Sequence, residues 1–98
     1  MQEVTNLNRL VYFAAVIDAG SFTKAAEHLG ITKAVVSQQV ARLEQDVGTT
    51  LLMRTTRRLQ PTEAGRVFHA RCVSILRETE DAFNELAEAR TDPKGLLK

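Results

Sequence analysis

The sequence has few of the residues that covalent and metal-dependent sites require. Its 98 residues include one cysteine, Cys72, which excludes an internal disulfide and is typical of a reducing compartment. Neither histidine has a cysteine, aspartate or glutamate at metal-ligand or catalytic-triad spacing, and no glycine-rich phosphate loop is present. These absences argue against an enzyme, and we expect no metal or cofactor in this chain.

Long apolar runs are also missing. No stretch approaches the ~18 consecutive apolar residues that span a bilayer, and the first residues lack the basic start and apolar segment of a signal peptide. We therefore expect a cytoplasmic protein without membrane contacts.

Two amphipathic patterns lie close together between Ser21 and Gly48. The first stripe recurs at helical spacing and comprises Phe22, Ala25, Ala26 and Leu29. The second, which we expect to face the core, comprises Val36, Val40, Leu43 and Val47. Ser21 or Thr23 can cap the first helix, Gly30 ends it, and Thr32 can cap the second. The short connection forces a steep crossing, which is the pattern of a helix-turn-helix motif.

The opposite face of the second helix differs from an ordinary solvated surface. It carries small and amide side chains, with Lys33 at its edge: Ala34, Ser37, Gln38, Ala41 and Gln45. Small residues allow close approach to base edges, while Gln pairs bidentately with adenine and Lys reaches guanine. The pattern favours a recognition helix in the major groove of DNA. A polar face without a partner is the alternative.

A further helix and a hairpin complete the predicted domain. The helix precedes Gly20, and its apolar residues are Leu7, Leu10, Val11, Ala14 and Ile17. After Gly48, runs at 49–54 and 57–60 surround Thr55-Thr56 and predict two strands that pack on the helices. We therefore expect a winged helix, with a three-helix core and a two-stranded wing.

Although the formal net charge is +1, the charged residues are distributed unevenly along the chain. Residues 53–71 carry five arginines and one glutamate, whereas residues 77–92 carry two arginines and six acidic residues. Because Arg54, Arg57 and Arg58 crowd together without nearby acids in the sequence, we expect the wing to contact phosphates or a narrow minor groove. The alternative is a solvated basic turn.

Pro61 and Thr62 are expected to start a long helix, which continues from Glu63 to about residue 89. Its apolar stripe steps by four and three residues, close to a coiled-coil seam, and we expect these residues to form a dimer interface: Phe68, Cys72, Ile75, Thr79, Ala82, Phe83 and Leu86. We interpret Cys72 as a packing residue of that stripe. Such a dimer would present two recognition helices to a near-palindromic operator.

Nearly the whole chain resembles the N-terminal DNA-binding region of a LysR-type transcriptional regulator. The resemblance is carried by Leu10 with Phe13, by GSFTKAAEHLGIT at 20–32, VSQQVARLEQDVG at 36–48, LLMRTTRR at 51–58 and LQPTEAG at 59–65. It implies DNA reading by Thr32, Lys33, Ala34, Ser37 and Gln38, and wing contacts by Arg54, Thr56, Arg57 and Arg58. The chain departs from the family at Ala34, often Pro, and at Gln38, often Arg.

The resemblance also implies how the chain is divided. We expect a winged helix-turn-helix domain at 1–61, a dimerisation helix at 62–90, and a hinge at 91–98 that leads to an absent effector-binding domain with a small-molecule effector. The expected function is sequence-specific binding of double-stranded DNA as a homodimer that regulates transcription in the cytoplasm, associated with the nucleoid. A tetramer and a contact with RNA polymerase are expectations for the intact protein only. The alternative is a winged-helix module for protein contacts, assembled through its long helix.

Overall fold

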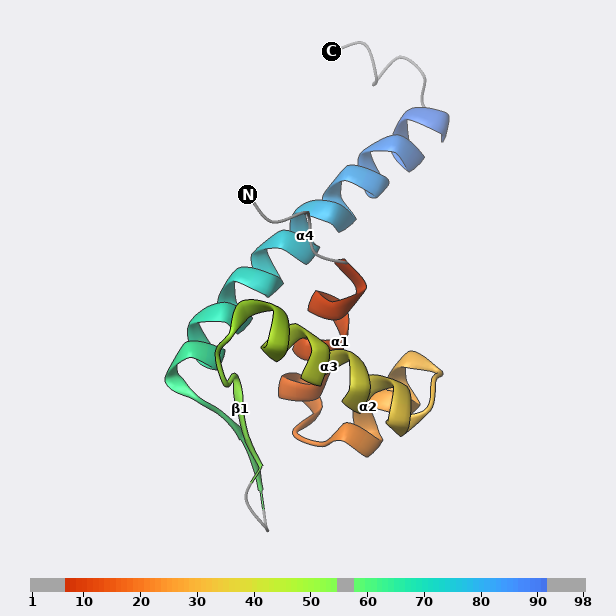
Figure 1. Ribbon diagram of the computed structural model, residues 1–98. Coiled ribbons are helices and arrows are strands. Elements are labelled where there is room, and N and C mark those ends of the chain that lie inside the picture. The colour runs from red at the N-terminus through yellow and green to blue at the C-terminus, as the bar shows by residue number, and fades with distance from the viewer. Residues whose placement is uncertain (1–6, 55–57, 92–98) are drawn as a thin grey trace.

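The computed structural model describes residues 7–54 and 58–91, and these ranges form four helices and two strands. In chain order they are α1 (Leu7–Ala19), α2 (Phe22–Leu29), α3 (Lys33–Val47), β1 (Leu52–Arg54), β2 (Leu59–Pro61) and α4 (Glu63–Thr91). Figure 1 shows α1, α2 and α3 gathered into one body, a thin β-ribbon extending from it, and α4 running past the body and away from it. The predicted winged helix-turn-helix with a long C-terminal helix is confirmed.

Local hydrogen bonds fix the ends of the two central helices. Ser21 Oγ accepts the backbone N–H three residues on at 3.1 Å, so Ser21 rather than Thr23 is the N-cap of α2. Gly30 ends α2 with a φ of 70°, in the left-handed region that glycine adopts without strain. Thr32 Oγ1 accepts the backbone N–H of Val35 at 3.2 Å and caps α3 as predicted.

An apolar core joins the helices to the root of the wing. Its buried members are Leu10, Phe13, Ala14, Val16, Ala25, Ala26, Val36, Val40, Leu43, Leu51, Leu52 and Cys72. Two predictions were wrong at the margins of this core. Val47 is 46% exposed, because it lies at the rim of a groove between the end of α3 and the start of α4. Leu7 is 52% exposed, because the buried face of α1 is centred on Phe13 and Val16.

The wing is an antiparallel pair in which Leu52 lies opposite Pro61 and Arg54 opposite Leu59. Each strand has three residues, fewer than the predicted runs. Pro61 belongs to β2 and does not start α4, a position that a two-stranded ribbon tolerates because each strand has a free edge. Thr62 instead caps α4, since its Oγ1 accepts the N–H of Gly65 at 3.0 Å.

The root of the wing and the start of α4 are joined by short backbone contacts. The Thr62 N–H donates to the Leu51 carbonyl at 3.0 Å, and the Thr62 hydroxyl donates to the Thr50 carbonyl at 2.8 Å. A Cβ at Gly65 would lie 2.1 Å from the Leu51 oxygen, so the strand and helix approach as closely as only glycine allows. The wing and α4 therefore share one rigid joint.

The long helix α4 packs on the core with its first half only. The Phe68 ring lies 5.6 Å from the Phe13 ring, and Cys72 is fully buried, which raises the pKa of its thiol to about 11. Further along, Phe83 is 67% exposed and Leu86 60% exposed. With 29 residues at ~1.5 Å each, the helix is about 43 Å long. No helix in the described ranges combines the length and hydropathy that a membrane crossing needs.

Polar contacts fasten α1 to its neighbours. Arg9 Nε donates to Gln39 at 3.1 Å, and the Arg9 guanidinium pairs with Asp46 near the end of α3. His69 of α4 lies 3.0 Å from a carboxylate oxygen of Asp18, and its side chain is 22% exposed. The sequence gives no sign of this contact because the two residues are 51 positions apart. Throughout residues 7–54 and 58–91, every buried side-chain nitrogen or oxygen has a hydrogen-bond partner.

Candidate nucleic-acid interface

The face of α3 that points away from the core is accessible to a partner. Lys33, Ala34 and Gln38 are exposed, and Ser37 is half-buried beside them. Thr32 is exposed as well, although its hydroxyl oxygen accepts the capping hydrogen bond. The structure thus brings the predicted reading residues together on the first turns of one helix, where a major groove could receive them.

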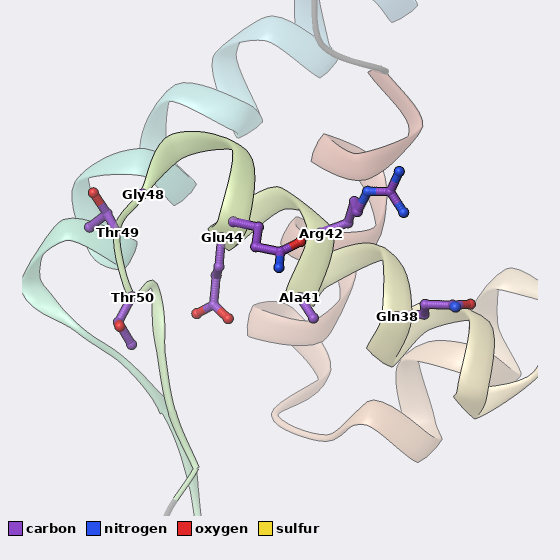
Figure 2. Close-up of a pocket in the computed structure, with 8 residues that line it drawn as sticks. Gln38, Ala41, Arg42, Glu44, Gly48, Thr49 and Thr50 are labelled. Carbon is purple, nitrogen blue, oxygen red and sulfur yellow. The ribbon is translucent and has the colours of Figure 1, made fainter.

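An open groove of about 590 Å³ continues this face towards the wing. It lies between the second half of α3 and the segment after it, and is lined by Gln38, Ala41, Arg42, Glu44, Gln45, Gly48, Thr49 and Thr50. Figure 2 shows Ala41 and Glu44 directed to the wing side of α3, whereas Arg42 extends away from it. Thr49 and Thr50 are exposed on the segment that forms the opposite wall, and the Thr49 hydroxyl donates to the Val47 carbonyl at 3.3 Å.

The carboxylate of Glu44 lies where α3 meets the wing. Its Oε2 accepts the backbone N–H groups of Leu51 at 2.7 Å and Leu52 at 3.0 Å. The sequence pattern assigned no role to Glu44. The available signal was its position beside Leu43, at the edge of the apolar stripe and a few residues before the hairpin, but such a residue equally fits a solvated helix face.

The wing arginines differ from the prediction in one respect. Arg54 Nη1 lies 3.5 Å from Glu44 Oε1, so the expectation that no acid pairs with this arginine was wrong. Its guanidinium carbon also lies 5.4 Å from the centre of the Phe22 ring. Arg58 is exposed, while Thr56 and Arg57 fall outside the described residues. Arg54 remains 44% exposed, so a phosphate can still reach it.

Residues 7–66 match the model of a known family, the bacterial regulatory helix-turn-helix proteins of the lysR family. The matched range runs from the start of α1 through the wing to the first turn of α4. This chain belongs to the lysR family.

Curated relatives agree with this membership. An HTH-type transcriptional regulator of Xanthomonas campestris pv. campestris (strain 8004) is 43% identical over 93 residues, which are 95% of this chain and 27% of the relative. The nitrogen assimilation regulatory protein nac of Klebsiella aerogenes is 48% identical over 77 residues, 79% of this chain and 25% of the relative. The chain thus spans less than a third of the length of these relatives.

Solved structures with the same fold include complexes with DNA. The BenM DBD in its complex with catB site 1 DNA has a TM-score of 0.84 and 31% identity, over 88% of this chain and 96% of that one. Full-length CbnR, complexed with its target DNA, has a TM-score of 0.77 and 30% identity, over 87% of this chain and 29% of that one.

In this lysR-family chain, the residues predicted for a dimer contact fall into two sets. Phe68 is half-buried against α1, and Cys72 is fully buried within a single chain. Cys72 is thus a packing residue of the domain core, as predicted, and its place in a dimer contact stays a prediction. The remaining members lie further along α4 and keep accessible surface: Ile75, Thr79, Ala82, Phe83 and Leu86.

The predicted division of the chain extends beyond the described residues. The helix expected at 62–90 begins at Glu63 and continues to Thr91. The predicted hinge at 91–98 otherwise lies outside the residues that the structure describes. Within the described ranges, no group of three or more potential ligands gathers where it could hold a metal ion.

Proposed function

We propose that this lysR-family chain binds double-stranded DNA sequence-specifically as a homodimer and thereby regulates transcription. The observation that carries the proposal is the exposed face of α3, where Ala34, Ser37 and Gln38 leave a slender surface without acidic groups. Small side chains admit the helix to a major groove, and the Gln38 amide can pair with an adenine edge. Lys33 adds a positive charge at the end that would enter first.

The position of the wing is consistent with α3 entering the major groove. It extends from the body beside α3, and its exposed arginines Arg54 and Arg58 would face the sugar-phosphate backbone. The DNA complexes of the BenM DBD and CbnR, which share this fold, support the assignment by analogy.

The second half of α4 supports a homodimer. Phe83 and Leu86 are large apolar side chains with more than half of their surface exposed, on a helix that projects from the body. Arg66 and Arg71 lie on the first half of α4, whereas six acidic residues lie between 77 and 92. The family resemblance implies an antiparallel contact between two α4 helices, and such a pair would bring the basic half of one copy beside the acidic half of the other.

For the intact protein we propose the further features that the family resemblance implies. These are an effector-binding domain after α4 with a small-molecule effector, a tetrameric assembly, a contact with RNA polymerase, and a cytoplasmic, nucleoid-associated location.

Titration of labelled duplexes tests the proposal. The wild-type chain is expected to bind a duplex selected from a randomised pool saturably and more tightly than random DNA. Gln38→Ala should alter the preference at one or two base positions, by about 1 to 3 kcal/mol each. Arg57→Ala, at a wing position predicted from the sequence, should weaken binding to all duplexes and reduce the salt slope by about one.

Arg77→Ala is the matched control, because it removes the same charge from an exposed position on α4 away from the wing. It should leave the DNA affinity nearly unchanged. If the wild-type chain showed no saturable binding at low salt, a module for protein contacts would be the better interpretation.

A further inference from the structure

Glu44 belongs to the recognition helix α3, but its carboxylate binds the root of the wing. Its side chain is 14% exposed, and one oxygen accepts the N–H groups of both Leu51 and Leu52. A carboxylate that accepts two backbone N–H groups forms charge-assisted hydrogen bonds, which are stronger than those of a neutral acceptor. Glu44 therefore ties β1 directly to α3.

The second oxygen of Glu44 faces Arg54, the last residue of β1. The guanidinium lies 3.5 Å from this oxygen on one side and 5.4 Å from the centre of the Phe22 ring on another. With 44% of its side chain still exposed, Arg54 is held at its inner edge and accessible at its outer edge. The contacts restrict where its positive charge can lie relative to α2 and α3.

The same stretch of chain is also fixed from the side of α4. Thr62 donates to the carbonyls of Thr50 and Leu51, so these carbonyls and the N–H groups bound by Glu44 are all occupied. The root of the wing is thus clamped between α3 and α4. On the α3 side of this clamp, the Glu44 carboxylate binds the N–H groups of both Leu51 and Leu52.

We propose that Glu44 is a positioning residue for DNA binding, which sets the wing and Arg54 at a fixed place relative to the recognition helix. This inference rests on the proposed DNA binding. The expected effect on DNA affinity is opposite to the effect that net charge alone predicts. Removing a negative charge from the groove beside α3 should strengthen the attraction to phosphates, yet loss of Glu44 should weaken binding because the wing no longer meets the backbone while α3 reads the bases.

Glu44→Gln tests this with little change in shape. In anisotropy titrations of a duplex that the wild-type chain selects from a randomised pool, we expect about a tenfold loss of affinity and a salt slope lower by about one. Amide exchange of Leu51 and Leu52 should accelerate, while the amides of α1 remain protected. Glu27→Gln, which removes the same charge from an exposed position on α2, should change none of these.

Equal or tighter binding by Glu44→Gln would overturn the inference, and so would weaker binding with unchanged exchange of the two amides. If Glu44→Gln lost helical circular dichroism, Arg54→Gln would decide instead. It should lower the salt slope similarly while Leu51 and Leu52 stay protected by the intact carboxylate, and an unchanged slope would overturn the role assigned to Arg54. Absence of saturable binding by the wild-type chain would overturn the proposed function itself, an outcome distinct from these.

Discussion

Gly65 occupies a position in the first turn of α4 where a methyl group has no room. Alanine normally stabilises a helix relative to glycine by up to about 1 kcal/mol, but the added carbon would lie 2.1 Å from a backbone oxygen of Leu51. Relief of such an overlap requires a backbone shift of the kind that costs about 1 to 3 kcal/mol. The steric cost therefore outweighs the helix propensity.

We accordingly expect Gly65→Ala to lower the free energy of unfolding by about 1 to 3 kcal/mol, measured by urea denaturation. Ala70→Gly, at an exposed position of the same helix, gives the size of the propensity effect alone. A stabilised Gly65→Ala variant would contradict the close contact between the wing root and α4.

Cys72 makes stability depend on pH in the alkaline range. Burial raises the pKa of its thiol from 9.0 to about 11, so the native chain retains a proton that the unfolded chain releases. The stabilisation is fully present below pH 9 and is lost as pH rises towards 11, by up to about 3 kcal/mol. The free energies of unfolding of the wild type and Cys72→Ala, plotted against pH across this range, should converge, since the variant lacks the titrating group. Parallel curves would contradict the assignment.

The role of a residue could be predicted where it depended on which face of one helix the residue occupies. It could not be predicted where it depended on a contact with another element. The exposure of Ala34 and Gln38 followed from the periodicity of α3, because the apolar stripe fixed which side faces the core. The role of Glu44 did not follow, since its partners are the amides of Leu51 and Leu52 in another element. The pairing of Asp18 with His69 was missed for the same reason.

At the scale of elements, the two halves of α4 have different partners. The first half buries Cys72 against the core, while Phe83 and Leu86 remain exposed. Periodicity predicted one continuous stripe, because spacing shows which face is apolar but not what covers it. The same limit explains α1, where the structure buries Phe13 and Val16 and leaves Leu7 exposed.

We expect Phe83→Ser to weaken dimerisation while the core remains folded. Burial of a phenylalanine contributes about 1.5 to 3 kcal/mol, and each dimer has two copies, so the dissociation constant of the dimer should rise by about 100-fold to 10,000-fold. Sedimentation equilibrium measures this change. Asn84→Ser, one position further along α4, serves as a control and should leave the constant unchanged. Equal dissociation constants for Phe83→Ser and wild type would place the dimer contact elsewhere.

At the scale of the whole molecule, a two-fold dimer should require two half-sites on one side of the duplex. An insertion of about five base pairs between half-sites rotates one relative to the other by about half a helical turn. We expect the inserted duplex to bind no more tightly than a single half-site, as measured by gel shift. Undiminished binding to the inserted duplex would mean that the two DNA-binding domains of the dimer move independently.

The joint at Gly65 gives this architecture a mechanical property. Because the strand and helix meet there without intervening side chains, we expect a tilt of α4 to carry the root of the wing with it. A tilt of about 5° displaces the far end of a 43 Å rod by about 4 Å, close to the 3.4 Å rise of one base-pair step. In a dimer built this way, a small change in the angle between the two α4 helices would change the distance between the two DNA-binding modules by about one base-pair step.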